Sequence, residues 1–348
     1  MSVDLTTRYG GLVFPSPIVV SACPLVAHEQ TRLAMERAGA GAVVLPSLYE
    51  EQVLIWYDRD GVKLSAEERR ILEIAKNLQV EPCCADADAY LAMVQRASEQ
   101  MTIPVIASLN GYTASNWVDF AGELQRAGAD GIELNIHHPP PMVYSNPREI
   151  EDSVVEAVAK IDAAISIPLF VKLQCEYTSI SHLARRLQSG TQGLVLFGQA
   201  PSIDICLDRL SLKPSWDLTQ PGSIVHALGT LLEVHSYCPA IPLAASGGIG
   251  TPIDVIRALL SGADVAMVAS ALYREGPDVI RTLIDGLVLY MERHRWTSLA
   301  DLRDHRPLQF RSEEHREIYL RALATRFGLA HTQPGERTLH GDGWGHLQ

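Results

Sequence analysis

A lysine stands in the middle of one of the most apolar segments of the chain, Phe170-Val171-Lys172-Leu173. An ammonium group is rarely buried unless an anion or a strong hydrogen-bond acceptor meets it. Two interpretations stay open. In the first, Lys172 forms a structural ion pair with Glu133, which lies in the preceding apolar run. In the second, it holds a positive charge against an electron-poor ring or an oxyanion, which makes it a binding or catalytic group.

A glycine-rich turn, Ser246–Gly250, follows another apolar run and precedes Thr251 and Pro252, two residues that typically begin a helix. Glycines let the backbone turn tightly and approach a ligand closely. After the next apolar run, Ala269-Ser270-Ala271 offers further free backbone amides. Free amides at the ends of neighbouring strands are typical of a phosphate site. The alternative is a tight turn that only packs a helix on a sheet.

Amide and imidazole side chains complete the set of candidate groups. Asn110, Asn135 and Gln199 stand at or near the ends of apolar runs, and His137-His138 follows Asn135 closely. Asn135 is either a satisfied core amide or a group that donates to and accepts from a ring edge. A histidine such as His138 can remove a proton near neutral pH, although an exposed pair without a role fits as well. No acidic or histidine partner is obvious nearby, so no metal site is expected.

The elements that must position these residues follow from an alternation of apolar runs and helical stretches. The predicted strands are 18–22, 42–45, 104–109, 131–136, 168–173, 193–197, 241–245 and 263–268. Such alternation predicts parallel strands joined by right-handed crossovers. An open doubly wound sheet is the competing architecture. Eight units, with the phosphate turns after the last two, favour a single (β/α)8 TIM barrel of the α/β class, with an N-terminal hairpin closing its floor.

Two further boundaries are expected. The barrel would span 1–300, and 301–348 would form a C-terminal extension whose last part is polar, glycine-rich and flexible. A long, charged loop from 48 to 86 would follow the second strand. A connection of this length is typical of a functional lid, and a surface insertion without a role is the alternative.

Composition narrows the class of protein. The chain has 348 residues, 47% of them hydrophobic, and a formal net charge of −12 without any strongly basic block. Nucleic acid is therefore not an expected partner. No apolar run reaches the roughly 18 residues of a membrane span, and the first residues lack the features of a signal peptide. The six cysteines form no CxxC motif. We expect a cytoplasmic protein that acts on a small molecule, with no membrane contact.

Five segments of the chain resemble, in order and spacing, the FMN-dependent dihydroorotate dehydrogenase family, and its cytosolic class above all. They are GIELNIHHPP, PLFVKL, GLVLF, IPLAASGGI and VASAL, and the resemblance covers nearly the whole predicted barrel. It implies an oxidoreductase with FMN as its cofactor that acts on a CH–CH bond. The implied reaction is dihydroorotate to orotate, a step of pyrimidine biosynthesis.

The resemblance also implies roles for single residues. Lys172 would lie at the pyrimidine edge of the flavin and stabilise the reduced anion, and Asn135 would bond the ring or the substrate beside it. The positions expected to hold the phosphate through their backbone are Gly247, Gly248, Ala269 and Ser270. The positions expected around the ring are Ser21, Ala22 and Ser47, with Asn110 as a less clean match.

This chain departs from the family at positions that act on or bind the substrate. His138 occupies the position of the catalytic base, a cysteine in the cytosolic class, and Pro140 replaces a substrate-binding asparagine. The alternatives are therefore an FMN oxidoreductase for another small substrate, a flavin-bearing electron-transfer subunit, or a barrel lyase without flavin. The resemblance suggests a soluble electron acceptor or redox partner, and a homodimer is one expected assembly.

Overall fold

Eight parallel strands form a closed ring at the centre of the computed structural model, which describes residues 3–78, 84–111, 117–136, 146–307 and 312–328. The strands are β3 (Ile18–Val20), β4 (Ala42–Val44), β6 (Val105–Asn110), β7 (Gly131–Asn135), β8 (Leu169–Leu173), β9 (Gly193–Leu196), β12 (Leu243–Ser246) and β13 (Val265–Val268). Their order is β4-β3-β13-β12-β9-β8-β7-β6, and a pairing of β4 with β6 closes the ring. The predicted TIM barrel is confirmed.

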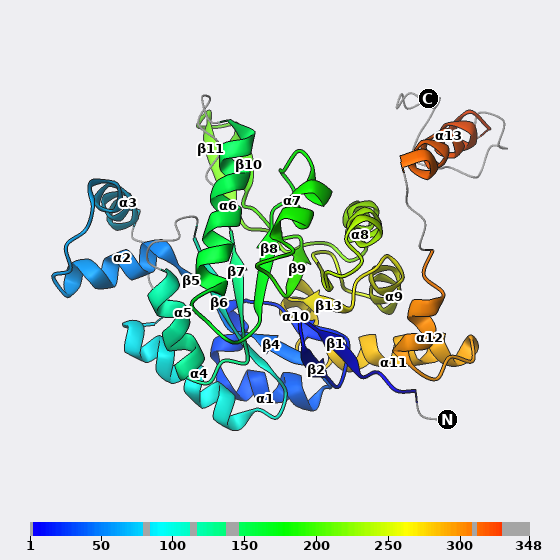
Figure 1. Cartoon of the computed structure of the whole chain (residues 1–348), viewed down its shortest axis with the longest axis horizontal. Helices are drawn as coiled ribbons and strands as arrows, with labels where there is room; N and C mark the ends of the chain where they lie inside the picture. The colour runs from blue at the N-terminus through cyan, green and yellow to red at the C-terminus, as the bar shows by residue number, and fades with distance from the viewer. Residues whose placement is uncertain (1–2, 79–83, 112–116, 137–145, 308–311, 329–348) are drawn as a thin grey trace. The chain divides into compact units, whose positions relative to one another are not determined.

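Helices surround this ring (Figure 1). Those between successive strands are α1 (Glu29–Arg37), α4 (Ala87–Gln100), α5 (Trp117–Arg126), α6 (Pro147–Asp162), α7 (Ile180–Leu187), α8 (Val225–Tyr237) and α9 (Pro252–Leu260), and α11 (Val279–Arg293) follows β13. The expected start of α9 is confirmed, because Thr251 caps the helix and Pro252 occupies its first turn. Three short helices accompany them: η1 (Pro24–Ala27), α10 (Ser270–Glu275) and α12 (Leu299–Asp304).

The side chains of the strands alternate between two cores, as the period of a strand requires. Outward residues such as Val171 and Leu173 pack against the helices, whereas Phe170 belongs to a separate cluster. That cluster joins inward residues of most barrel strands, namely Val19, Ala42, Val44, Ile106, Phe170, Val195, Ala244, Val265 and Met267. The lower part of the barrel interior is therefore apolar.

The N-terminal hairpin closes the floor of the barrel, as predicted. It consists of β1 (Thr7–Tyr9) and β2 (Leu12–Phe14). Tyr9 stacks on Phe170 with 4.6 Å between ring centroids, and its hydroxyl donates to the Leu194 carbonyl at 3.2 Å. Phe14 has no exposed surface and belongs to the same inner cluster. The hairpin thus fills the end of the barrel at which the strands begin.

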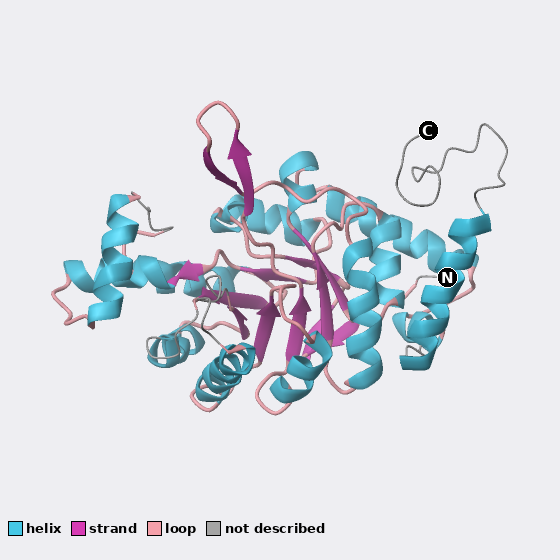
Figure 2. Ribbon diagram, turned by 90° about the horizontal axis from the view of Figure 1, so that it is seen from above, coloured by secondary structure: helices cyan, strands magenta, loops and turns pink. Residues whose placement is uncertain are grey.

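The stretch after β4 is more ordered than a long loop. It contains β5 (Leu48–Tyr49), which pairs with β6, then α2 (Glu50–Arg59) and α3 (Ala66–Asn77). Leu54, Leu64 and Leu72 form a small core of their own between these helices. Ser65 caps α3 through a capping box with Glu68. Figure 2 shows the helical pair extending from one side of the barrel.

A second hairpin interrupts the pattern after β9. It consists of β10 (Ser202–Cys206) and β11 (Ser211–Ser215), which pair only with each other among the described strands. Figure 2 shows it projecting away from the barrel. The eight predicted strands do not include this hairpin.

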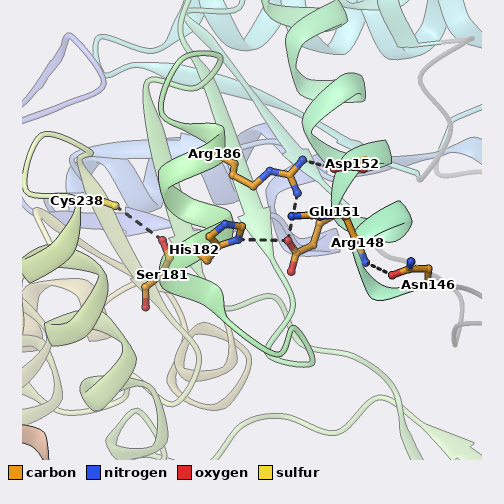
Figure 3. A network of polar contacts seen from close by, with 8 residues as sticks. All are labelled: Asn146, Arg148, Glu151, Asp152, Ser181, His182, Arg186 and Cys238. Carbon is orange, nitrogen blue, oxygen red and sulfur yellow. Dashed lines mark hydrogen bonds and ion pairs between the residues drawn. The ribbon is translucent and has the colours of Figure 1, made fainter. Parts of the chain in front are cut away.

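A polar network joins α6 to α7 on the outside of the barrel (Figure 3). Arg186 of α7 donates to Glu151 at 3.2 Å and also pairs with Asp152, both on α6. His182 places Nδ1 3.6 Å from the same Glu151 carboxylate. These contacts link the two helices.

The chain divides into two compact units, Met1–Pro307 and Leu308–Gln348. The first holds the barrel, and the second holds α13 (Ser312–Gly328). The expected flexibility of the last residues concerns a part that lies outside the described ranges. No described helix combines the length and the apolar character that crossing a bilayer demands.

The floor of the barrel provides a stability test. Phe14→Ala should lower the free energy of unfolding by about 3–5 kcal/mol, because it empties a fully buried aromatic position. Urea denaturation followed by circular dichroism measures the change. The neighbour Val13 is 47% exposed, so Val13→Ala should change it by less than about 0.5 kcal/mol. Equal effects of the two substitutions would contradict the role of the N-terminal hairpin in closing the floor of the barrel.

Candidate functional site

A cavity of about 510 Å³ opens where the barrel strands end. It collects most of the residues singled out from the sequence: Ser21, Ala22, Ser47, Asn135, Lys172, Gly247, Gly248, Ala269 and Ser270 all line it. Asn110 is buried and pairs in register with Asn135, but it is not among the lining residues. His138 lies outside the described residues. The carboxyl-terminal end of the strands is where TIM-barrel enzymes hold their active sites.

Lys172 lies deep in this cavity, with 6% of its surface exposed. Its Nζ donates to Ser21 Oγ at 3.1 Å and to Glu133 Oε1 at 3.2 Å. Glu133 is 1% exposed. The ion pair considered from the sequence is therefore present, and the same ammonium group faces the cavity. Structural and binding roles are compatible here, because an ammonium has three protons to donate.

The glycine turn is shaped by close backbone packing. Gly248 has φ +72°, and a Cβ on it would lie 2.3 Å from Ser223 Oγ and 2.4 Å from the Ile224 nitrogen. Only glycine fits such an approach. Asp254 Oδ2 accepts hydrogen bonds from the backbone N–H of Gly222, Gly250 and Thr251. The buried Asp254 carboxylate thus holds the turn at Gly222 and the turn at Gly250 and Thr251 together.

Thr219 connects the two turns that were expected to hold a phosphate. Its Oγ1 accepts from the Gly248 N–H at 3.1 Å and donates to Ser270 Oγ at 3.0 Å. Its own N–H donates to Ser270 Oγ, also at 3.0 Å. Sequence reasoning missed Thr219, because no periodic pattern marks the segment between β11 and α8. The turns after β12 and β13 do lie together, as predicted.

Two amide oxygens lack partners among the described residues. Asn135 Oδ1 and Gln174 Oε1 are buried and accept no hydrogen bond there. Both amides lie near Gly198, where a Cβ would be 2.9 Å from Gln174 Nε2 and 3.4 Å from Asn135 Oδ1. A buried acceptor without a donor is costly. Of these two residues Asn135 lines the cavity, so a ligand there that carries a hydrogen-bond donor could satisfy its amide.

Gln199, singled out from the sequence, also lines the cavity, and residues that the sequence does not predict form the rest of the wall. Trp216 donates its indole N–H to the Gln199 carbonyl at 3.2 Å, and Gln199 Nε2 donates to the Asp217 carbonyl at 2.6 Å. The other unpredicted lining residues include Cys23, Tyr49, Phe197, Leu218, Met267 and Tyr273. Burial raises the pKa of the Cys23 thiol and of the Tyr273 phenol. Both groups therefore stay protonated near neutral pH.

The Ser47 side chain forms a hydrogen bond with Ser108 of β6. Its Oγ lies 2.8 Å from Ser108 Oγ, and the Tyr90 hydroxyl donates to the carbonyls of Pro46 and Ser108 at 2.8 and 3.2 Å. Tyr90 has no exposed surface. This buried hydroxyl fixes the end of β4 relative to β6, and with it the position of Ser47 in the wall.

The site combines three features: glycine turns and hydroxyls at one end, a buried cation, and the Asn135 amide, which lines the same cavity. Amides at one end suit an anion such as a phosphate. A cation in a low-dielectric wall stabilises negative charge that develops on a bound ring. Among the described residues, no group of three histidine, cysteine or carboxylate side chains is placed to hold a metal ion.

Comparison with known proteins agrees with this arrangement. A family model described as dihydroorotate dehydrogenase matches residues 82–291, which include β6 through β13. The chain is 26% identical over 308 residues to the dihydroorotate dehydrogenase B (NAD(+)) catalytic subunit of Thermoplasma acidophilum, covering 86% of this chain and 97% of the relative.

Two further relatives carry similar names. Dihydroorotate dehydrogenase A (fumarate) of Limosilactobacillus reuteri is 29% identical over 209 residues, 58% of this chain and 67% of that one. The B-type catalytic subunit of Pyrococcus abyssi is 25% identical over 299 residues, 84% of this chain and 95% of that one. At such identities the chain is a divergent relative. It belongs to the dihydroorotate dehydrogenase family and is an oxidoreductase of that type.

Proposed function

We propose that the cavity binds FMN and that the chain uses it to oxidise a CH–CH bond of a small cyclic substrate. Dihydroorotate, with orotate as the product, is the substrate that the family implies. The observation that carries the proposal is the position of Lys172, whose buried ammonium lines the same cavity as the glycine turn. The residues present fit the cofactor. The volume suits a ligand of this size, and the Gly248 turn and Ser270 form one end of the cavity.

FMN, when bound, supplies a ring that accepts a hydride. The chain supplies position and charge. Lys172 stabilises negative charge on the ring, and Glu133 and Ser21 keep its ammonium in place through their contacts at 3.2 and 3.1 Å. Asn135 presents an acceptor oxygen to the ring or to the substrate beside it. We assign removal of the substrate proton to His138, because histidine titrates near neutral pH.

A second candidate is an FMN oxidoreductase for another small substrate. It is favoured by Phe197, Trp216 and Leu218, which make part of the cavity wall apolar and aromatic. Pro140 also lacks the side-chain donor expected for binding orotate.

The proposal also includes the electron acceptor. Relatives are named for fumarate and for NAD(+), so we infer a soluble acceptor or redox partner, in the cytoplasm. A homodimer is part of the same proposal.

The substrate is tested by an anaerobic absorbance spectrum of the purified protein before and after addition of dihydroorotate. The proposed reaction should bleach the flavin band within seconds. A flavin band that persists with dihydroorotate but bleaches with dithionite would support FMN as the cofactor and exclude dihydroorotate as the substrate. Absence of a flavin band from protein reconstituted with FMN would overturn the cofactor assignment.

The role of Lys172 is tested by the flavin midpoint potential. Lys172→Met combined with Glu133→Gln removes the cation without leaving an unpaired buried carboxylate. We expect a potential about 30–60 mV more negative, because a hydrogen bond from a charged donor to the reduced ring is lost. Lys160→Met, at an exposed ion pair on α6, is the control and should leave the potential unchanged. The same potential in the double variant and the wild type would refute the role.

The glycine turn is tested by FMN affinity. Gly248→Ala should weaken binding at least about tenfold, because the new Cβ would push the turn away from Ser223 and Ile224. Gly229 in α8 has open space around it, so Gly229→Ala serves as the matched control. Fluorescence titration of the apoprotein measures both. A folded Gly248→Ala protein with unchanged affinity would place the phosphate elsewhere.

A further inference from the structure

One stretch of the cavity wall, residues 216–219, is anchored at both ends. All four of its residues line the cavity. At the first end, the Gln199 carbonyl accepts from the Trp216 indole N–H at 3.2 Å, and Gln199 Nε2 donates to the Asp217 carbonyl at 2.6 Å. At the other end, the last residue of the stretch donates from its hydroxyl to Ser270 Oγ at 3.0 Å. We call this stretch the wall segment, and these contacts hold it in place beside a bound ligand.

The charges of the described wall are unbalanced. Its charged residues are Lys172 and Asp217. Lys172 is neutralised by its ion pair with Glu133 at 3.2 Å. Asp217 Oδ2 accepts from Ser215 Oγ at 2.9 Å, and no ion pair between described residues includes this carboxylate. The part of the wall that the structure describes therefore has one uncompensated charge, and that charge is negative.

The wall also lacks an arginine that could bind a substrate carboxylate, as far as the structure describes it. Arg274 donates to the Leu218 carbonyl of the wall segment at 3.1 Å, but it is not a lining residue. Three internal segments of the barrel unit lie outside the described ranges, and their sequences contain no lysine or arginine: 79–83, 112–116 and 137–145. A substrate carboxylate would therefore meet a like charge at Asp217, and like charges placed together in a recognition site reduce affinity.

Aromatic rings add a second preference for positive charge. The rings that line the cavity belong to Tyr49, Phe197, Trp216 and Tyr273. A cation is attracted to the face of an aromatic ring, and most strongly to that of tryptophan. Trp216 is 59% exposed, so its ring is accessible to a ligand, and it directly precedes Asp217 in the wall segment. A carboxylate next to an accessible indole is a combination that suits an ammonium group.

We propose that the cavity selects a cyclic substrate that carries a positively charged nitrogen, and that Asp217 and Trp216 are the specificity-determining residues. The inference rests on the proposed function and names the substrate class of its second candidate. The reaction itself is unchanged: the substrate gives a hydride to the flavin and a proton to the base, so that its CH–CH bond becomes a double bond. The charged nitrogen takes no part in this step and serves only for recognition. Dihydroorotate, which carries a carboxylate, is disfavoured.

The first test compares three ligands that share one ring and differ in charge. They are orotate and two analogues in which a neutral hydroxymethyl or a cationic aminomethyl group replaces its carboxylate. Titration of the full-length protein loaded with FMN, followed by the change in flavin absorbance near neutral pH, gives the dissociation constants. We expect the aminomethyl analogue to bind at least about tenfold more tightly than orotate, because attraction to Asp217 replaces repulsion. The preference should decrease with added salt, since Asp217 is exposed.

The second test changes the wall segment. Asp217→Asn should bring the affinities for the aminomethyl analogue and orotate within about threefold of each other, and Asp217→Lys should reverse their order. Trp216→Leu should weaken binding of the aminomethyl analogue more than binding of the hydroxymethyl analogue, because only the former loses a cation–π contact. Asp204→Asn is the control, because Asp204 pairs across the hairpin with Lys213 and does not line the cavity. It should leave the preference unchanged.

Two results would overturn the inference. The first is an aminomethyl analogue that binds the wild-type protein no more tightly than orotate. The second is a preference that Asp217→Asn leaves unchanged, since another group would then recognise the charge. Failure of the proposed cofactor has a different signature, the absence of a flavin band. Calorimetric titration of the apoprotein with the same three ligands would then still measure the preference for a cation.

Discussion

The ion pair of Lys172 with Glu133 sets the boundary between two halves of the barrel interior. Below it, aromatic and aliphatic side chains close the floor. Above it, the same inward positions of the strands carry polar residues: Ser21, Ser108, Asn110, Asn135 and Ser246. A buried ion pair is tolerated only with good geometry and further hydrogen bonds, and Ser21 supplies one. The cavity above depends on this boundary, because the pair gives it a charged base instead of an apolar one.

The end of the cavity that is proposed to bind a phosphate combines backbone turns with hydroxyl groups. The Gly248 N–H donates to Thr219 Oγ1, the Thr219 hydroxyl donates to Ser270 Oγ, and Asp254 holds the surrounding turns from a buried position. Backbone groups make few demands on side-chain identity. A chain can therefore diverge widely in sequence and keep this end, provided that glycine stays where a Cβ would collide. The rest of the wall includes large side chains such as those of Trp216 and Leu218.

Local patterns were enough to place the barrel strands and most of the candidate site. Short apolar runs predicted the strands within about three residues, and glycines and Lys172 stood out because they break those runs. The features that local sequence patterns do not predict depend on contacts between distant segments of the chain. Thr219 matters only because its segment returns to β12 and β13. Residues 202–206 alternate with the period of a strand, but so short an alternation does not by itself predict the projecting hairpin. The role of His138 stays a prediction.

The two ends of the barrel unit are joined at the floor. The Asp4 N–H donates to the Thr297 carbonyl at 2.8 Å, Thr7 Oγ1 donates to the Asp264 carbonyl at 3.2 Å, and β3 pairs with β13. β3, the first strand of the barrel, thus finds one of its neighbours only when β13, the last strand, has been synthesised. Such distant pairing slows folding. During translation, the nascent chain therefore has an open, incomplete ring with unpaired strand edges until β13 has been synthesised.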